Sequence, residues 1–465
     1  MDFWVFEIKF FDAWIAIGVM TVVFLLANVL RRKVGIIRKS LLPTAVLAGL
    51  IMLILKALGL YDWLNLDRNE VNTFFEALTY HALALGVIAL TLKSTKKEKA
   101  RNRQIEIFNS GLITVNTYLL QGIIGAGVTL LLATTFMKNL FPASGLLLPL
   151  GYGQGTGQAV NFGHMYEVKH GFFGGTSFGL TIATVGFLIA CLVGVGHIVL
   201  MRRRGKIKEV EKNEFVTTEI VASPNEVPVT EAIDRMTIQI VLMLLVYFLT
   251  FLFMFGIEQL PLGKFGEESV KPLIWGFNFL IGSLLAALLK IVFRGLKKIN
   301  LMTRDYPNNY LLNRISGFCF DIMIVAGTSA IEMSVLKELI LPLVIICFVG
   351  AVLTYFYVRK LSYTLFPDYQ DEAFLSLFGM LTGTTSTGMI LLREVDPRFE
   401  TPAANNLIYQ AFYAIALGFP LFLLLGIAPK GTKHTFISLL VLVAMFIVFN
   451  ILLFRRQLFG KKRKA

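Results

Sequence analysis

The sequence predicts an all-α polytopic membrane protein made of two inverted five-helix repeats, each with a re-entrant hairpin, plus one extra C-terminal helix. Three observations lead to this fold class. Long apolar runs recur along the whole chain, Lys and Arg gather in alternate connecting segments, and two Gly-rich stretches occupy matching places in the two halves. The composition agrees, because 56% of the residues are hydrophobic and 16% are charged, whereas soluble domains have about 45–50% and about 25%.

Eleven apolar runs have roughly the length of about 20 residues that a membrane-spanning helix needs. They lie near 12–30, 41–60, 75–92, 107–136, 172–200, 235–257, 272–293, 311–333, 339–358, 403–428 and 434–454. Two further stretches, near 143–166 and 374–396, are apolar but interrupted by Gly and polar residues. Lys56, near the end of the second run, is expected to extend its ammonium group toward the membrane surface.

The charges of the connecting segments predict the orientation in the cell membrane. With the N-terminus outside, the cytoplasmic segments contain 30 Lys and Arg and the outer segments contain 9. This excess fits the positive-inside rule and places the C-terminus in the cytoplasm. It requires that each interrupted stretch enters and leaves on one side. The net charge of +14 therefore reports orientation rather than nucleic-acid binding, since no aromatic or folded module accompanies the basic clusters.

The two interrupted stretches resemble each other and reveal an internal repeat. A shift of 228 places Gly151 on Gly379, Gly155 on Gly383 and Thr156 on Thr384, and it also superposes the order of the spans. Because each half has five spans, an odd number, the second half starts on the opposite side of the membrane, as in many secondary transporters.

The chain is therefore expected to have four parts. These are the N-terminal repeat with its hairpin (1–200), a cytoplasmic linker (201–234), the inverted C-terminal repeat with its hairpin (235–428), and the extra helix with a basic cytoplasmic tail (429–465).

Each interrupted stretch is expected to form two half-helices around an open tip. Four Gly between Gly151 and Gly157 would each cost a continuous helix about 1 kcal/mol. Gly379, Gly383 and Gly388 act similarly at wider spacing. A half-helix N-terminus carries about half a positive charge and suits a carboxylate, while exposed carbonyl and hydroxyl oxygens suit a hard cation such as Na⁺.

The tip side chains are neutral and rich in oxygen, as such a site requires. The predicted substrate-binding residues are Gly155, Thr156, Gly157, Gln158 and Asn161 at the first tip, and Gly383, Thr384, Thr385 and Ser386 at the second. The alternative is that Gly and Thr only allow close helix packing.

Ionisable residues inside spans are functional candidates. Asp321 lies mid-span, and it is predicted to bind Na⁺ together with Thr384 and Ser386, or to carry a proton. Its alternative role is a buried carboxylate bonded to the backbone. Arg393 follows the second tip and is a candidate to clamp a substrate carboxylate, although it can equally extend to the cytoplasmic face.

Enzymatic activity is not expected. Gly175–Gly179 matches the nucleophile-elbow pattern around Ser177, but that motif requires a strand-to-helix turn and here lies in a Gly-rich apolar helix. The sequence contains no phosphate-binding loop for ATP hydrolysis and no HExxH motif.

The second hairpin, with Gly379–Gly388 followed by Leu391–Pro397, resembles the corresponding stretch of the bacterial sodium:glutamate symporter family. The Gly-rich first hairpin, from Gly151 to Gln158, looks like the first re-entrant loop of that family. The resemblance covers residues 12–428. It implies two inverted five-helix repeats, a homodimer, elevator-like movement, and glutamate and Na⁺ bound between the tips, near Gly155–Gln158 and Gly383–Ser386.

The expected function is therefore Na⁺-coupled symport of glutamate, a small anionic amino acid. Two alternatives stay open: a H⁺- or Na⁺-coupled carrier of another carboxylate, and an ion channel. No repeated charged ring is visible to support a channel filter.

Overall fold

The computed structural model describes residues 8–93, 101–205, 229–261, 263, 266, 271–302, 306–397 and 399–455. All regular elements in this part of the chain are helices, as predicted. Ten of them are long and apolar enough to cross a membrane, so ten of the eleven predicted spans are confirmed as helices of sufficient length and composition. Most of the predicted 201–234 linker and of the basic C-terminal tail lies outside the described residues.

The second predicted span, 41–60, is shorter than expected. Helix α3 (Thr44–Ala57) has 14 residues, which is about 21 Å of helix against a hydrocarbon core of about 30 Å. It ends because Gly59, which precedes the short α4 (Leu60–Trp63), adopts a left-handed conformation with φ of 86°. The length prediction for this span was therefore wrong.

The described residues fall into two compact units. The larger unit takes its residues from 8–76, 101–201 and 325–455, and the smaller unit from 77–93 and 202–324. Three helices contribute residues to both: α5 (Arg68–Leu92), α15 (Asn309–Ala330), and α9 (Gly175–Arg203) with its last two residues. This division is based on packing, whereas the four predicted parts are consecutive stretches of the sequence. The four parts therefore stay a prediction.

The larger unit contains most of the helices. In chain order after α1 (Phe10–Lys33), α2 (Gly35–Lys39), α3 and α4, they are α6 (Arg101–Thr134), η2 (Pro142–Leu147), α7 (Leu148–Gln154), α8 (Thr156–His170), α9 (Gly175–Arg203), η4 (Lys337–Leu339), α16 (Ile340–Leu365), η5 (Pro367–Tyr369), α17 (Gln370–Thr382), α18 (Thr385–Arg393), α19 (Ala403–Ile427), η6 (Ala428–Lys430) and α20 (Thr432–Leu453).

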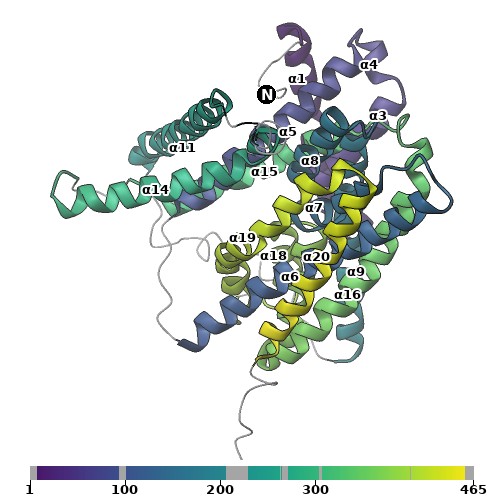
Figure 1. Cartoon of the computed structure of the whole chain (residues 1–465). Helices are drawn as coiled ribbons and strands as arrows, with labels where there is room; N and C mark the ends of the chain where they lie inside the picture. Colours follow the sequence, from purple (N-terminus) through teal and green to yellow (C-terminus); the bar gives the residue numbers. More distant parts are fainter. Residues whose placement is uncertain are drawn as a thin grey trace, which may run out of the picture. The chain divides into compact units, whose positions relative to one another are not determined.

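Helix α6 is the centre of packing in the larger unit. It contacts η2, α7, α16, α17, α19 and α20, and α20 runs beside it (Figure 1). The approach of α6 to η2 requires glycine on both sides, because a Cβ atom on Gly125 would lie 1.9 Å from the Gly145 carbonyl oxygen. The extra C-terminal helix thus packs against the central helix of this unit.

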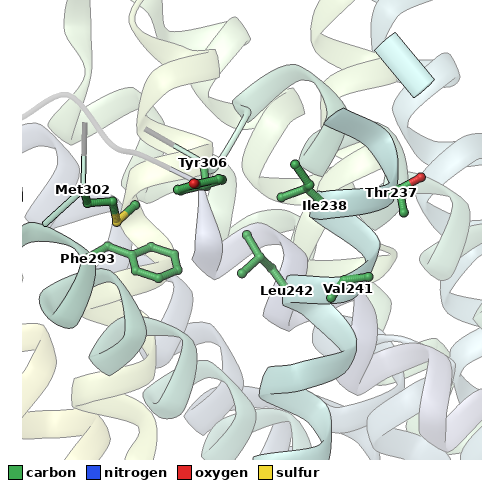
Figure 2. A pocket seen from close by; sticks show the side chains of 7 residues that line it. All are labelled: Thr237, Ile238, Val241, Leu242, Phe293, Met302 and Tyr306. Carbon is green, nitrogen blue, oxygen red and sulfur yellow. The ribbon is translucent and has the colours of Figure 1, made fainter. Parts of the chain in front are cut away.

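The smaller unit is built from α11 (Val229–Glu258), α13 (Lys271–Gly276), α14 (Asn278–Lys298) and the remaining parts of α5 and α15. An apolar cluster that includes Ile88, Val246, Ala286 and Ile315 forms its core. A pocket of about 330 Å³ lies in this unit. It is lined mainly by apolar side chains of α11 and α14 and of the residues that follow α14 (Figure 2). None of the predicted site residues lines this pocket.

The two interrupted stretches form broken helices as predicted. Helix α7 ends at Gln154 and α8 begins at Thr156, and a shift of 228 turns these numbers into 382 and 384. Helix α17 ends at Thr382, and Thr384 is the N-cap of α18. The longest of the four half-helices, α8, has 15 residues, about 22 Å, so none is long enough to cross a membrane alone.

The helix after each hairpin begins with the same type of cap. The Glu167 carboxylate accepts hydrogen bonds from two backbone N–H groups and from the Thr176 hydroxyl, at 2.7 Å, where α9 begins. The Asp396 carboxylate likewise accepts from two backbone N–H groups and from the Thr401 hydroxyl, at 2.6 Å, just before α19. Both hairpins are thus followed by a helix whose start is capped by a carboxylate, while the inverted repeat itself stays a prediction.

Candidate functional site

The first helix break lies at Gly155, between α7 and α8. Its φ of 78° and ψ of −168° are accessible to glycine and strained for other residues. The backbone N–H of Gly155 makes no C-capping hydrogen bond to α7. The break therefore leaves carbonyl groups at the end of α7 and N–H groups at the start of α8 without partners inside the helices.

The second break lies at Gly383 and Thr384, between α17 and α18. Thr384 is the N-cap of α18, and its hydroxyl accepts a hydrogen bond from the backbone N–H of Thr387, at 3.4 Å. Gly383 makes no C-capping bond to α17. Both breaks thus combine the negative end of one half-helix with the positive end of another.

The two hairpins lie together in the larger unit. Helices α7 and α17 contact each other, and α9 packs against both. A Cβ atom on Gly186 of α9 would lie 2.5 Å from the Thr382 carbonyl oxygen and 3.0 Å from the ring of Tyr152. Only glycine allows α9 to approach the second break this closely.

Helix α6 makes hydrogen bonds to both hairpins. The Tyr118 hydroxyl donates to the Gly153 carbonyl, at 3.0 Å, two residues before the first break. The Gln121 amide donates to the Leu381 carbonyl, at 2.9 Å, two residues before the second. The same amide nitrogen also donates to the Thr354 hydroxyl of α16, at 3.1 Å.

The fold and these breaks agree with the comparison with protein families. The profile described as sodium/glutamate symporter matches residues 9–401. The chain belongs to the sodium/glutamate symporter family. None of the curated proteins compared with it matches.

Membership of this symporter family makes the chain a multi-pass membrane protein of a transporter class, which agrees with its ten long apolar helices. The family description also supports the predicted terms symporter, sodium and glutamate, and it supports the prediction that the chain is not an enzyme. Ser177 has a structural contact: its hydroxyl accepts a hydrogen bond from the backbone N–H of Glu332, at 3.0 Å.

The predicted residues of the first tip are all buried. Gly155, Thr156, Gly157, Gln158 and Asn161 lie on or beside the first turns of α8. Gln158 is 2% exposed, and its side-chain oxygen accepts no hydrogen bond within the described part of the chain. A buried acceptor of this kind is suited to a ligand that brings a donor or a positive charge.

Thr156 packs directly on helix α15. A Cβ atom on Gly327 would lie 2.7 Å from the Thr156 side chain. The next residue, Thr328, has its hydroxyl 3.4 Å from the hydroxyl of Thr184 on α9. These two buried hydroxyls were not predicted, because Thr within an apolar helix carries no sequence signal of its own.

The predicted residues of the second tip are more open. Gly383 is buried and Thr384 half-buried, whereas Thr385 and Ser386 are exposed. Arg393 is exposed at the end of α18, about 12 Å along the helix from Thr385. Its role as a carboxylate clamp stays a prediction.

Asp321, the predicted Na⁺ ligand, lies on α15 in the smaller unit, and its side chain is exposed. Its role also stays a prediction. Among the described residues, no group of three or more His, Cys, Asp or Glu side chains is arranged to bind a metal ion. The oxygen atoms at the two breaks, which are neutral, are of the kind that Na⁺ accepts.

A buried ion pair was missed in the sequence. Lys56 does not extend to the surface but is 4% exposed, and its ammonium group lies 3.2 Å from the Glu332 carboxylate. It also donates to the Asn72 side chain, at 2.7 Å, and to the Ile331 carbonyl, at 2.8 Å. Nothing in the sequence pairs residues this far apart, so only the fold reveals the partner.

Proposed function

We propose that this chain carries glutamate into the cell in symport with Na⁺, and that both bind at the two helix breaks. The observation that carries the proposal is the pair of broken hairpins in one unit, both bonded to α6, in a chain of the sodium/glutamate symporter family. Neutral oxygens and helix ends at membrane depth are the usual means by which transporters bind an anionic substrate with Na⁺.

The ends of the half-helices suit the two carboxylates of glutamate. The first turn of α8 offers the backbone N–H groups of Gly157 and Gln158, and the first turn of α18 offers those of Thr385 and Ser386. These groups have no partner inside their helices and lie at positive helix ends. One carboxylate at each N-terminus would match the two carboxylates of glutamate, and the exposed Arg393 at the opposite end of α18 stays a separate candidate clamp.

The repeats, the orientation in the membrane, the oligomeric state and the transport movement belong to the same proposal. The two halves are inverted repeats whose hairpins are re-entrant, since no half-helix is long enough to cross a membrane. The N-terminus lies outside, the C-terminus lies in the cytoplasm, and the protein is a homodimer in the cell membrane. The larger unit carries the substrate across by an elevator-like movement, with Thr384 and Ser386 contributing to Na⁺ binding. Asp321 keeps its proposed role as a cation ligand or proton carrier.

The test is uptake of labelled L-glutamate into proteoliposomes, with Na⁺ replaced by K⁺ or choline and the pH gradient clamped. Saturable uptake that requires Na⁺ is the expected result. Uptake that is driven by a pH gradient and does not depend on Na⁺ would show that the coupling ion is H⁺ instead of Na⁺. Transport of other carboxylates with no uptake of glutamate would show that the substrate is a different carboxylate. Currents that do not saturate would indicate a channel.

A further inference from the structure

Gln121 on α6 has an arrangement that none of the site residues predicted from the sequence shares. Its side chain is fully buried, at 0% exposed. The amide nitrogen faces two acceptors, the Leu381 carbonyl and the Thr354 hydroxyl oxygen. A backbone carbonyl only accepts, so the nitrogen must face Leu381 and the amide cannot be reversed. The side-chain oxygen therefore points elsewhere, and it accepts no hydrogen bond from any residue that the structure describes.

The helix end that this amide contacts favours a cation over an anion. Leu381 is in the last turn of α17, a half-helix of 13 residues, and the carbonyls of that turn have no partner inside the helix. They form the negative end of the half-helix dipole, and Gly383 does not cap them. A carboxylate would be repelled here, whereas a positive charge would be stabilised.

The chemistry of the oxygen selects the kind of cation. The amide oxygen of Gln121 is a neutral, hard ligand, and so are the backbone carbonyl and the threonine hydroxyl that the nitrogen of the same amide contacts. It offers no thiolate or imidazole for a transition metal. The two hydrogen bonds of the nitrogen fix the orientation of the amide, so its oxygen is positioned before a ligand arrives, which lowers the cost of binding.

We propose that the side-chain oxygen of Gln121 is a ligand of the coupling Na⁺, which binds at the carboxyl end of α17 with backbone carbonyls of the last turn. This inference rests on the proposed function for its coupling ion, and it adds a ligand from α6 to a site otherwise formed by the hairpins. The other monovalent cation that this chemistry would accept is the ammonium group of the substrate. Measurements without substrate distinguish the two.

The experiment measures thermal unfolding of the purified full-length protein in detergent against NaCl concentration, without glutamate and with choline chloride maintaining the ionic strength. Wild-type protein is expected to melt at higher temperature as Na⁺ rises, with a defined half-saturating concentration. Gln121→Met, which retains the volume and removes both the oxygen and the amide N–H groups, is expected to raise that concentration at least tenfold. If Gln121→Met does not fold, Gln121→Asn, which withdraws the oxygen by one methylene, is expected to raise it by a smaller factor.

The matched control is Asn116→Leu. Asn116 lies on the same helix, is equally buried, and also has a side-chain oxygen without a donor in the described part of the chain. Its nitrogen, however, donates to the Tyr357 hydroxyl, at 2.6 Å, and not to α17. Asn116→Leu is therefore expected to leave the half-saturating Na⁺ concentration within twofold of the wild-type value.

Parallel uptake assays in proteoliposomes separate failure of this inference from failure of the proposed function. If wild-type uptake requires Na⁺ but the Gln121 variants keep the wild-type Na⁺ affinity, the inference is overturned and the function stands. If the variants lose affinity for glutamate and keep the stabilisation by Na⁺ alone, the oxygen binds the substrate ammonium and the inference is again overturned. If Na⁺ neither stabilises the wild-type protein nor drives its uptake, both are overturned.

Discussion

Tyr118 and Gln121 lie one turn apart on α6, and each donates a hydrogen bond to a backbone carbonyl two residues before a helix break, Tyr118 at the first hairpin and Gln121 at the second. Residues three apart on a helix share a face, so one face of α6 is bonded to both hairpins. A displacement of either hairpin relative to α6 would break one of these bonds. The two tips are therefore positioned by a common element.

Tyr118→Phe is expected to raise the KM for glutamate several-fold while the maximal rate changes little, because it releases the carbonyl of Gly153 and loosens the first tip. The loss of one hydrogen bond should cost about 1 kcal/mol of stability. Uptake kinetics at saturating Na⁺ would measure the KM. Tyr80→Phe is the control, since the Tyr80 hydroxyl also donates to a backbone carbonyl, that of Trp275, at 2.7 Å, within the smaller unit. An equal rise of KM in both variants would contradict a specific role of Tyr118.

Gly186→Ala is expected to reduce glutamate uptake more than tenfold. The added Cβ would lie 2.5 Å from the Thr382 carbonyl oxygen, a backbone atom that moves only if the second break moves. Uptake rates normalised to the amount of inserted protein would measure the effect.

Gly196→Ala on the same helix is the matched control. A Cβ at Gly196 has no heavy atom within 4 Å, and Ala is a better helix former than Gly by about 1 kcal/mol. This variant should transport normally and melt at the same or a higher temperature. Normal uptake by Gly186→Ala would show that the approach of α9 to the second break is not needed for transport.

The fold was largely predictable because apolar periodicity and charge asymmetry are local signals. Apolar runs such as 235–257 and 434–454 directly predict helices, and the glycines of the two hairpins predict both helix breaks. The run at 41–60 was misjudged because its apolar residues continue past Ala57, where the left-handed Gly59 ends the helix. Composition alone does not reveal the conformation of a single glycine.

The site was predictable only where its residues belong to the hairpins. Gln121 and Tyr118 lie in an ordinary apolar helix, and their importance comes from acceptors 260 and 35 residues away. Lys56 was placed at the surface because a lysine near a span end normally extends to water. Its partner Glu332 is known only from the fold.

The double variant Thr156→Val, Thr384→Val is expected to weaken glutamate binding at least tenfold while the protein still folds. Valine retains the shape of threonine, and the change removes the hydroxyl at the start of α8 and the N-cap of α18. Binding of labelled glutamate to purified protein at saturating Na⁺ would measure it. Thr250→Val in the smaller unit, where the hydroxyl donates to the Val246 carbonyl of its own helix at 2.8 Å, should bind glutamate normally. Normal affinity of the double variant would refute the two-tip site.

Asp321→Asn is expected to raise the Na⁺ concentration required for half-maximal uptake or to abolish uptake, because a carboxylate contributes a full negative charge to a cation. Uptake as a function of Na⁺ concentration would measure the change, with glutamate saturating. Unchanged Na⁺ dependence would assign Asp321 a structural role on α15. Thermal unfolding without glutamate would distinguish Asp321 from Gln121. Only a side chain that binds Na⁺ in the absence of substrate should, when replaced, change the stabilisation by Na⁺.

Lys56→Met is expected to lower the melting temperature clearly, since it leaves the Glu332 carboxylate without its cation. Breaking a fully buried pair costs about 3–5 kcal/mol, and the cost here should be smaller because the Glu332 side chain is 28% exposed. The double variant Lys56→Met, Glu332→Gln should recover part of the loss. Arg68→Met is the control, because the Arg68–Asp62 pair is exposed and such pairs contribute little.

The pH dependence of the same pair follows from the Glu332 carboxyl group. Burial alone would raise its pKa, but the Lys56 ammonium and the Ser334 hydroxyl lower the pKa below its ordinary value of 4.5. A carboxyl with a lowered folded-state pKa stabilises the protein fully above its unfolded pKa, and the stabilisation is lost as the pH falls through the folded pKa. Wild-type protein should therefore lose more thermal stability below about pH 4.5 than the double variant does. Parallel acid profiles of the two proteins would show that the ion pair contributes nothing to this stability.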